Sequence, residues 1–324
     1  MSDSLRLSVP DFGDPAQRAF FFDVAAAAID VDGYDPFNEQ ARLDVESGRR
    51  SPIVVRLTTG DATEPLERPV GAAILGRGEL DFVIDPLFRG KGYGEQAVRG
   101  LLATARGTLT AWSHGDHPAA RRLAERHGFA PVRTLLHLVA PLDGLGDDAD
   151  HTAGAAAGAP VGAASDALPE GFTLGPMRPG DEEEWVELNA RIFDRHPEQG
   201  RLTLDDLRAR QAERWFDAAD VLMLRDASGH LVGYDWVKVE SDSPEGEVYV
   251  LGVDAALGGR GLGRLLLRAG LERLAARGCK QAGLYVEADN ETAVRLYRSA
   301  GFLEHTVDVQ YRRAIESTDP FIHS

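Results

Sequence analysis

A glycine- and arginine-rich turn at residues 258–264 has the composition of an anion-binding site. Gly261 and Gly263 allow the backbone to come close to a phosphate, and Arg260 and Arg264 add positive charge beside it. The first amides of a helix have no intrahelical partner, and the helix dipole favours negative charge there. A helix that starts here is therefore expected to bind a pyrophosphate, although a glycine-rich turn alone is also typical of an ordinary strand-to-helix connection.

The turn is positioned by a strand before it and an amphipathic helix after it. Residues 247–254 have the composition of a strand, and a helix with Leu266 and Leu274 on its apolar side extends to about Ala276. A dinucleotide-binding Rossmann unit would have its glycines directly after the first strand of its domain. At least two predicted strands precede this one, so we reject the Rossmann alternative.

The sequence downstream of the turn supplies a second motif. Residues 281–287 are predicted to form a strand, and residues 290–302 a helix that Asn290 caps and Gly301 ends. This order of elements resembles the GNAT superfamily of N-acetyltransferases, in which two strands splay to admit the pantetheine arm. The family's Gln/Arg-x-x-Gly-x-Gly/Ala loop is matched except at its first position, which is Gly258 here. The family's Asn-x-x-Ala-x-x-x-Tyr helix with its closing Gly-Phe is complete: Asn290, Ala293, Tyr297, Gly301 and Phe302.

Length and composition describe an ordinary soluble protein of about two domains. The 324 residues are 43% hydrophobic and 27% charged, so each half can bury a core. The net charge of -17 argues against nucleic acid as a partner, and it is compatible with a cationic small-molecule substrate or simply with solubility. Cys279 is the only cysteine, which excludes an internal disulfide and a cysteine-based metal cluster, and we expect no metal. Without a signal-like or membrane-spanning apolar run, we expect a cytoplasmic monomer that does not bind membranes.

The chain contains an internal duplication. A segment at residues 143–170, rich in Ala, Gly and Asp, has no helical or strand period and reads as a flexible linker. Three short stretches recur on either side of it: 83–85, 92–94 and 127–129 before it, and 252–254, 261–263 and 300–302 after it. We therefore predict two tandem GNAT domains at residues 1–142 and 171–324, each an α/β (α+β) fold with a mixed sheet flanked by helices. In the second half, strands are expected near Phe172 and at residues 221–225, 231–239, 247–253, 282–286 and 302–311.

The two copies differ at the positions that would carry chemistry. The run Arg89-Gly-Lys-Gly-Tyr-Gly94 satisfies the whole loop pattern, so the first copy should still hold a CoA pyrophosphate. With the spacing of the closing Gly-Phe, however, Tyr297 corresponds to Ala124, and with the spacing of the glycine loop Glu247 corresponds to Gly78. We therefore expect the first domain to bind acetyl-CoA without catalysis, and the second domain to perform the reaction.

Glu247, Leu251 and Tyr297 are the candidates for the chemistry. Acetyl transfer to an amine needs a neutral amine, a polarised thioester carbonyl and a proton for the leaving thiolate. Glu247 could accept the amine proton, a backbone amide near Leu251 could bind the carbonyl oxygen if the strand is splayed or bulged, and Tyr297 could protonate the thiolate. Strict alternation would put Glu247, Tyr249, Leu251 and Val253 on one face, unless a bulge disturbs it. The competing interpretations are a solvated strand end for Glu247 and a packed aromatic for Tyr297.

Three further stretches resemble the mycothiol synthase family of tandem acetyltransferases. They are residues 196–200, 236–238 and 246–254, and the resemblance is dense from about Arg195 onward. It implies an enzyme that acetylates the cysteinyl amine of 1D-myo-inositol 2-(L-cysteinylamino)-2-deoxy-α-D-glucopyranoside (Cys-GlcN-Ins) with acetyl-CoA. In that family the second domain performs this reaction, which completes mycothiol.

The same resemblance implies roles for individual residues. Glu247 would be the base and Tyr297 the acid. The acceptor would be held by five residues: Glu39, Glu198, Lys238, Glu247 and Tyr285. In the second domain acetyl-CoA would contact Leu251, Gly252, Val253, Gly258, Gly259, Arg260, Gly261, Leu262, Gly263, Arg264, Asn290, Glu291, Thr292, Ala293, Val294 and Arg295. In the first domain a second acetyl-CoA would contact Phe82, Val83, Ile84, Arg89, Gly90, Lys91, Gly92, Tyr93 and Gly94.

Two other functions stay open at this point. A tandem acetyltransferase for another amine, such as an aminoglycoside or a peptide N-terminus, would share the motifs, but the stretches at His196 and Trp236 count against it. A non-catalytic acyl-CoA sensor is favoured by the intact loop of the first copy and disfavoured by the catalytic candidates of the second. The acceptor carboxylates and Lys238 could equally be surface residues. Gly258 and Gly259 stand where the family has Gln and Arg, which leaves the pyrophosphate to the arginines and the amides.

Overall fold

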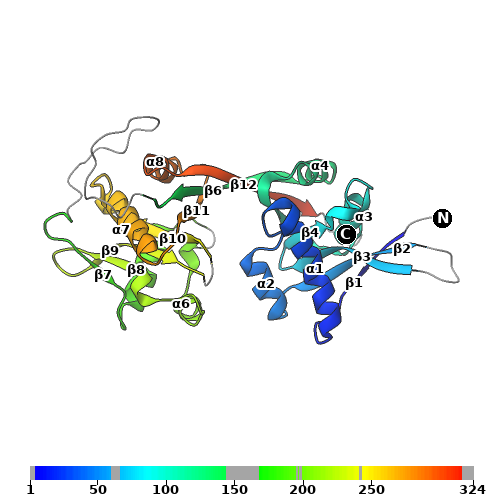
Figure 1. Ribbon diagram of the computed structural model, residues 1–324, viewed down its shortest axis with the longest axis horizontal. Coiled ribbons are helices and arrows are strands. Elements are labelled where there is room, and N and C mark those ends of the chain that lie inside the picture. The colour runs from blue at the N-terminus through cyan, green and yellow to red at the C-terminus, as the bar shows by residue number, and fades with distance from the viewer. Residues whose placement is uncertain are drawn as a thin grey trace, which may run out of the picture. The chain divides into compact units, whose positions relative to one another are not determined.

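The computed structural model describes residues 4–59, 66–143, 168–194, 196, 199–240 and 243–315 (Figure 1). The predicted linker lies, apart from its ends, outside the described residues. The strands are β1 (Ser4–Ser8), β2 (Ser51–Thr59), β3 (Leu66–Gly76), β4 (Glu79–Ile84), β5 (Gly107–Ser113), β6 (Ala130–Pro141), β7 (Thr173–Pro176), β8 (Val221–Arg225), β9 (Leu231–Lys238), β10 (Glu245–Val253), β11 (Gln281–Glu287) and β12 (Leu303–Ile315). The helices are α1 (Pro15–Asp32), α2 (Glu39–Glu46), α3 (Tyr93–Thr104), α4 (Pro118–Arg126), α5 (Glu182–Ile192), α6 (Leu204–Gln211), α7 (Leu262–Ala276) and α8 (Glu291–Ser299).

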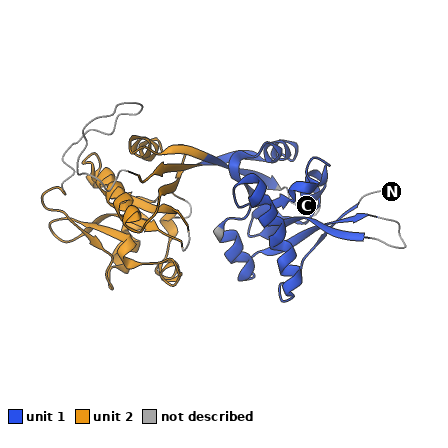
Figure 2. Cartoon of the chain, in the orientation of Figure 1, with its two compact units in different colours: residues 1–135, 306–324 blue, residues 136–305 orange. Residues whose placement is uncertain are grey.

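The chain forms two compact units, which Figure 2 colours separately. The first unit consists of Met1–Leu135 and Thr306–Ser324, and the second of Leu136–His305. Each unit combines a mixed sheet with helices, which confirms the predicted α/β fold class. The domain boundaries at residues 142 and 171 stay a prediction, because the compact units divide the chain within β6 and β12 instead.

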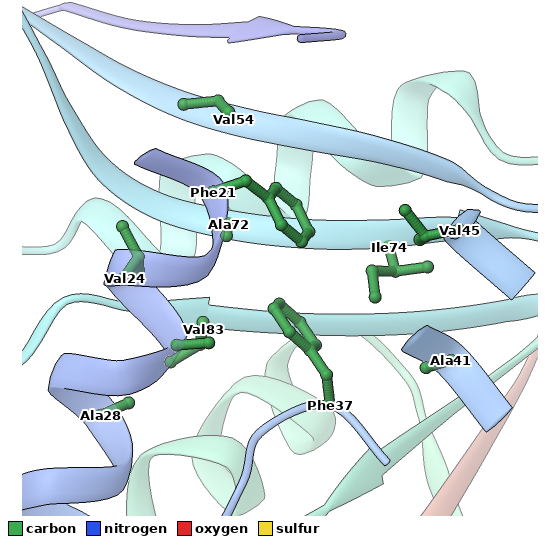
Figure 3. Close-up of a cluster of buried hydrophobic side chains, with 11 residues drawn as sticks. Phe21, Val24, Ala28, Phe37, Ala41, Val45, Val54, Ala72, Ile74 and Val83 are labelled. Atoms are coloured by element: carbon green, nitrogen blue, oxygen red, sulfur yellow. The ribbon is translucent and has the colours of Figure 1, made fainter. Parts of the chain in front are cut away.

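The first unit is a sheet of order β1-β2-β3-β4-β5-β12 with α1 and α2 on one face. Asp14 caps α1 and Pro15 opens it, so the helix starts at a defined residue. Figure 3 shows the core beneath it, where the rings of Phe21 and Phe37 stack 5.4 Å apart above the sheet. This apolar layer holds the helices in place, and the opposite face of the sheet packs against α3.

The second unit is a sheet of order β6-β11-β10-β9-β8-β7. Every residue of β9 is buried, as expected for a strand with neighbours on both edges and helices on both faces. The leucine-rich side of α7 packs on one face, and α7 crosses the strands in Figure 1. On the other face Trp185 of α5 and Leu207 of α6 pack against Trp236 of β9. The candidate site lies at the ends of β10 and β11, between these two helical layers.

Each unit takes one strand from the other half of the sequence. The last part of β12 pairs antiparallel with β5, from Val309 opposite Ser113 to Ile315 opposite Gly107. Asp308 reinforces this pairing because its carboxylate accepts hydrogen bonds from the Gly115 amide at 2.9 Å and the His114 ring at 2.8 Å. Conversely, the part of β6 after Leu135 lies beside β11 in the second unit. The repeats are therefore not two self-contained consecutive segments.

The predicted elements of the second half agree with the structure within a few residues. The strands at 221–225, 231–239, 247–253, 282–286 and 302–311 correspond to β8 to β12, and β7 follows Phe172 directly. The helix expected after Gly261 is α7, and Gly301, with φ of 91°, ends the helical turn after α8. Among the described helices, none combines the length and apolar composition that crossing a bilayer requires.

Candidate active site

The parallel strands β10 and β11 separate within the sheet of the second unit. Their register joins Glu245 to Gln281 and Glu247 to Gly283, and it ends there. On its other side, β10 stays paired with β9 as far as Val253. The splay expected from the sequence is therefore present, and Glu247 marks the point from which the gap opens.

Backbone amides of β10 point toward this gap. The amide of Asp254 donates to Val232 of β9 at 2.8 Å. In an antiparallel pair such bonds recur at every second residue, so the amides of Leu251 and Val253 point away from β9. They face the side on which β11 has left the sheet. A donor at Leu251 in this position suits the carbonyl oxygen of a thioester.

A β-bulge at Tyr249 changes which way the side chains of β10 face. Val248 and Val250 take adjacent positions along β9, so Tyr249 is an extra residue in the strand. Counted along the ladder, Glu247 shares its face with Val250, which packs with α5 and α6, whereas Leu251 packs with α7. The single face expected for Glu247 and Leu251 is therefore wrong, because the bulge shifts the alternation by one residue.

Lys238 stands directly opposite Glu247 on β9. It is only 7% exposed, and its Nζ lies 2.9 Å from a carboxylate oxygen of Glu240 and 4.9 Å from the centre of the Trp215 ring. An ammonium group held by a carboxylate and an aromatic face has a fixed position. The surface-residue interpretation of Lys238 is therefore wrong, and a buried positive charge stands beside the candidate base.

Tyr297 lies on α8, which Asn290 caps by accepting a hydrogen bond from the Ala293 amide at 3.2 Å. The tyrosine is 7% exposed and its ring packs edge-on against Phe302 at 5.9 Å. Burial raises the pKa of the Tyr297 phenol far above its ordinary value, and the nearby Asp235 adds to the shift. In the described part of the chain no residue hydrogen-bonds to its hydroxyl. The phenol therefore stays protonated at neutral pH, as a proton donor must.

The loop before α7 has the backbone geometry of an anion cradle. Gly259 and Gly261 have φ values of 77° and 76°, which favour glycine, and a Cβ on either would meet nothing within 4 Å. Gly261 caps α7 without any side-chain hydrogen bond, so no side chain covers its first amides. A larger residue at position 259 would be strained at this φ. The loop thus fits a pyrophosphate, with Arg260 and Arg264 in the adjoining turn.

The predicted acceptor residues are described only in part. Tyr285 lies on β11, 52% exposed, with its ring stacked on His137 at 4.6 Å. Glu39 is the first residue of α2 in the first unit, and Glu198 lies outside the described residues. Sequence reasoning missed His137 because it precedes the linker and belongs to no motif. Only the strand exchange reveals that it is part of the second unit.

A buried acid on β9 was also missed. The Asp235 side chain is fully buried, and neither carboxylate oxygen has a hydrogen-bond partner among the described residues. Gly270 of α7 makes room for it, because a Cβ there would lie 2.1 Å from Asp235 Oδ2. Burial raises the pKa of Asp235 well above its usual value, because the charged form is disfavoured away from water. Its position opposite Leu251 puts it beside the candidate carbonyl-binding amide.

The first unit contains a cavity of about 520 Å³ at the matching place. The parallel register of β4 with β5 covers only Glu79 and Leu80, so these strands also splay. Gly92 caps α3 at φ of 82°. The guanidinium of Arg89, in the loop before α3, donates two hydrogen bonds of 2.7 Å to the carboxylate of Asp32. All but Lys91 of the predicted acetyl-CoA residues of this unit line the cavity: Phe82, Val83, Ile84, Arg89, Gly90, Gly92, Tyr93 and Gly94.

Strand register corrects one correspondence between the repeats. Because β4 has no bulge, the position that matches Glu247 is Glu79, and Gly78 is one residue off. Glu79 lies 3.0 Å from Arg50, whose buried guanidinium also binds Asp81 at 2.5 Å. The first unit therefore has a carboxylate at this position, but a buried cation neutralises it.

The correspondence of Tyr297 with Ala124 holds in the structure. The carbonyl of Tyr297 accepts from the Phe302 amide at 3.1 Å, and that of Ala124 accepts from the Phe129 amide at 2.9 Å. The first turn of the cradle helix also differs, because Glu95 stands where the second unit has Arg264. The first unit thus has the cradle and the splay, without the phenol.

Comparisons with known proteins agree with this description. The family model described as Acetyltransferase (GNAT) family matches residues 61–129 and 183–302, together more than half of the chain. A mycothiol acetyltransferase of Clavibacter michiganensis subsp. michiganensis is 46% identical over 290 residues, with 87% of each chain covered. One from Salinispora arenicola is 40% identical over 327 residues, covering 96% of this chain and 98% of that protein.

Solved structures of tandem length are also similar. A GCN5-related N-acetyltransferase from Sphaerobacter thermophilus superimposes with a TM-score of 0.68 at 25% identity, covering 96% of this chain and 95% of that one. A tandem GNAT protein from the clavulanic acid biosynthesis pathway gives a TM-score of 0.69 at 18% identity, covering 98% and 100%. The second likeness concerns the fold alone.

Proposed function

Because the chain belongs to the GNAT acetyltransferase family and, within it, to the mycothiol acetyltransferases, we propose that it transfers acetyl from acetyl-CoA to the cysteinyl amine of Cys-GlcN-Ins. This step completes mycothiol. The observation that carries the proposal is the gap between β10 and β11, which opens at Glu247 and toward which the amide of Leu251 points. A base and a carbonyl-binding donor at one gap are what amine acylation requires.

Glu247 is the general base in this proposal. The acceptor amine arrives as an ammonium ion, and the carboxylate takes its proton directly or through one water, which leaves a neutral nucleophile. The bulge supports this role, because it turns Glu247 to the face that carries Lys238 and leaves Leu251 on the other. The base and the acyl donor can then approach the gap from opposite faces of the sheet.

The groups that protonate the thiolate and bind the pyrophosphate lie on the face of the sheet that carries α7. Tyr297 donates its phenolic proton to the sulfur as the carbon–sulfur bond breaks, and burial keeps that proton in place until then. The amides at the start of α7, with Arg260 and Arg264, bind the pyrophosphate. In the first unit, the cavity with its glycine loop binds a second acetyl-CoA.

The test is CoA release from acetyl-CoA by the purified protein, measured with Cys-GlcN-Ins, with the same conjugate lacking its cysteinyl group, and with simple amines. Fast release with the cysteinyl conjugate alone is expected. Equal rates with all amines would contradict the assignment of the acceptor and leave an acetyltransferase with another substrate. No release with any amine would contradict the activity itself and favour a sensor.

A further inference from the structure

A histidine contributed by β6 lies on the acceptor side of the second unit. His137 lies beside β11, and its ring stacks on Tyr285 with the planes 13° apart. The ring of His305 packs edge-on against the His137 ring, with the ring centres 5.4 Å apart. Only 13% of the His137 side chain is exposed. The half-exposed tyrosine is thus held in one orientation by a buried aromatic partner.

The same histidine holds a carboxylate. Its Nε2 lies 3.6 Å from Oε1 of Glu245, and Gln281 donates to the other oxygen at 2.6 Å. The contact with His137 is the largest cause that holds the pKa of the Glu245 carboxyl below its usual range, against the opposing effect of burial. Glu245 is therefore ionised at neutral pH, with both oxygens held in place.

Gly283 brings these two groups next to the candidate base. It is the partner of Glu247 across the end of the parallel register. A Cβ at Gly283 would lie 2.5 Å from the Glu245 carboxylate and 3.0 Å from Nε2 of His137. Both groups therefore occupy the space that this glycine leaves open. Neighbouring strands are about 4.8 Å apart, so the Glu245 carboxylate and the His137 ring lie close enough to Glu247 for one side chain to span the distance.

We propose that His137 is a positioning residue of the acceptor site, which fixes the Tyr285 ring by stacking and the Glu245 carboxylate by the contact of its Nε2 with Oε1. The acceptor amine is then received as an ammonium ion between Glu245 and Glu247, which lie on one face of β10. Two carboxylates on one face attract a cation, and the neighbouring base removes its proton. This inference rests on the proposed function, which assigns Glu247 to proton transfer, and on the place in the acceptor site that the family resemblance implies for Tyr285.

Two variants separate the contacts of the histidine. His137→Phe keeps an aromatic ring against Tyr285 and loses the contact with Glu245, whereas His137→Gln loses the ring. We expect the KM for the acceptor to rise about tenfold in His137→Gln and about threefold to fivefold in His137→Phe. The KM for acetyl-CoA should stay within about twofold. His230→Gln, at an exposed histidine in the turn before β9, is the matched control and should change neither constant.

A double variant tests whether His137 acts through Glu245. Glu245→Gln should raise the acceptor KM, and adding His137→Phe to Glu245→Gln should cause no further rise, because the phenylalanine removes only a contact that the glutamine change has already altered. Calorimetric titration of the acceptor into the Glu247→Gln background should show the same losses without turnover. An unchanged acceptor KM in both His137 variants, or an equal rise in the KM for acetyl-CoA, overturns the inference.

The outcome is separable from that of the proposed function. If the wild-type protein prefers another amine to Cys-GlcN-Ins, the acceptor assignment fails, and the same variants are measured with the preferred amine. A selective rise in its KM supports the role of His137 for that acceptor. An unchanged KM for the preferred amine overturns that role.

Discussion

The two units share a glycine-loop cradle, and they differ at the fork of their sheets, by which we mean the point where two parallel strands separate. Both open a helix with a left-handed glycine, Gly92 or Gly261, and both separate a parallel pair of strands after it has begun. In the second unit the strand before the helix has a bulge at Tyr249, and the facing helix carries Tyr297. In the first unit the matching strand is regular, and Ala124 replaces the phenol.

Under the proposed function, binding and chemistry depend on separable features of one fold. The cradle needs only glycine conformations and free amides, which both units retain. Chemistry needs a carboxylate directed to the gap. In the first unit the equivalent Glu79 is ion-paired with the buried Arg50 instead. We therefore expect changes at the fork to affect turnover in the second unit alone.

The largest effect is expected from the two glutamates at the fork. Glu247→Gln should lower kcat/KM for acetyl transfer about 10² to 10⁴-fold, because the amide cannot accept the amine proton. Glu79→Gln, at the same ladder position of the first unit, should change it less than about twofold. Steady-state kinetics at a fixed pH measures both. Comparable losses in the two variants would break the distinction between the units.

The next effect concerns the phenol that only the second unit has. Tyr297→Phe should lower kcat about 10²-fold with little change in either KM, because the proton donor is lost while the ring still packs on Phe302. Since burial raises the pKa of this tyrosine, the wild-type rate should not fall through the ordinary tyrosine range near pH 10. A decline there that Tyr297→Phe removes would contradict the buried-phenol assignment.

A third contrast lies under the fork. Asp235 beside Gly270 in the second unit corresponds to Ala73 beside Leu101 in the first, an apolar pair in one buried cluster. Asp235→Ala combined with Gly270→Leu should therefore stabilise the second unit by roughly 2 kcal/mol at pH 7, because apolar contacts replace a buried acid that has no hydrogen-bond partner among the described residues.

The pH dependence of this change has a defined sign. The pKa of Asp235 is raised on folding, so the native protein keeps a proton that the unfolded chain releases above about pH 4. The wild-type free energy of unfolding should thus fall as pH rises above that value, and the double variant should lose this part of the slope. Denaturant unfolding at pH 5 and pH 8 measures it; parallel slopes in both proteins would contradict a protonated Asp235.

The smallest effect is expected from the first turn of each cradle helix. Arg264→Ala should raise the KM for acetyl-CoA about twofold to fivefold, because one cation near a helix N-terminus is lost. Glu95→Ala should tighten acyl-CoA binding to the first unit, because it removes a negative charge and releases Arg126, which lines the cavity. Calorimetric titration of CoA resolves the two sites. Weaker binding in Glu95→Ala would show that its ion pairs build the cavity.

The elements that sequence predicted well are those fixed by local residues. Asn290 caps a helix and Gly261 adopts a left-handed conformation wherever the chain goes next, so α7, α8 and the loop between β10 and α7 could be placed. The bulge could not, because Val248, Tyr249 and Val250 are all good strand residues and none marks the irregular position. Missing it produced both the wrong face for Glu247 and the wrong counterpart in the first copy.

The features that sequence missed depend on contacts between distant residues. Nothing in the composition of β6 or β12 says which unit each will complete, because both are amphipathic strands after a helix ending in Gly-Phe. His137 could therefore not be connected with Tyr285, which lies far along the chain. From the sequence, Asp235 is an ordinary polar residue in a strand. Only the structure shows that its carboxylate is buried in the space that Gly270 of α7 leaves open. The acceptor side was thus less predictable than the cofactor side.

The exchange of β6 and β12 determines when the protein can fold during its synthesis. The edge of β5 is completed by residues up to Ile315, which leave the ribosome about 200 residues later. At ordinary translation rates this delay is roughly 10 to 40 seconds, during which the nascent first half displays an unpaired strand edge. A chain that stops before β12 would keep that edge and be prone to pair with other polypeptides. The edge of β5 is therefore paired only in chains whose synthesis has continued through β12.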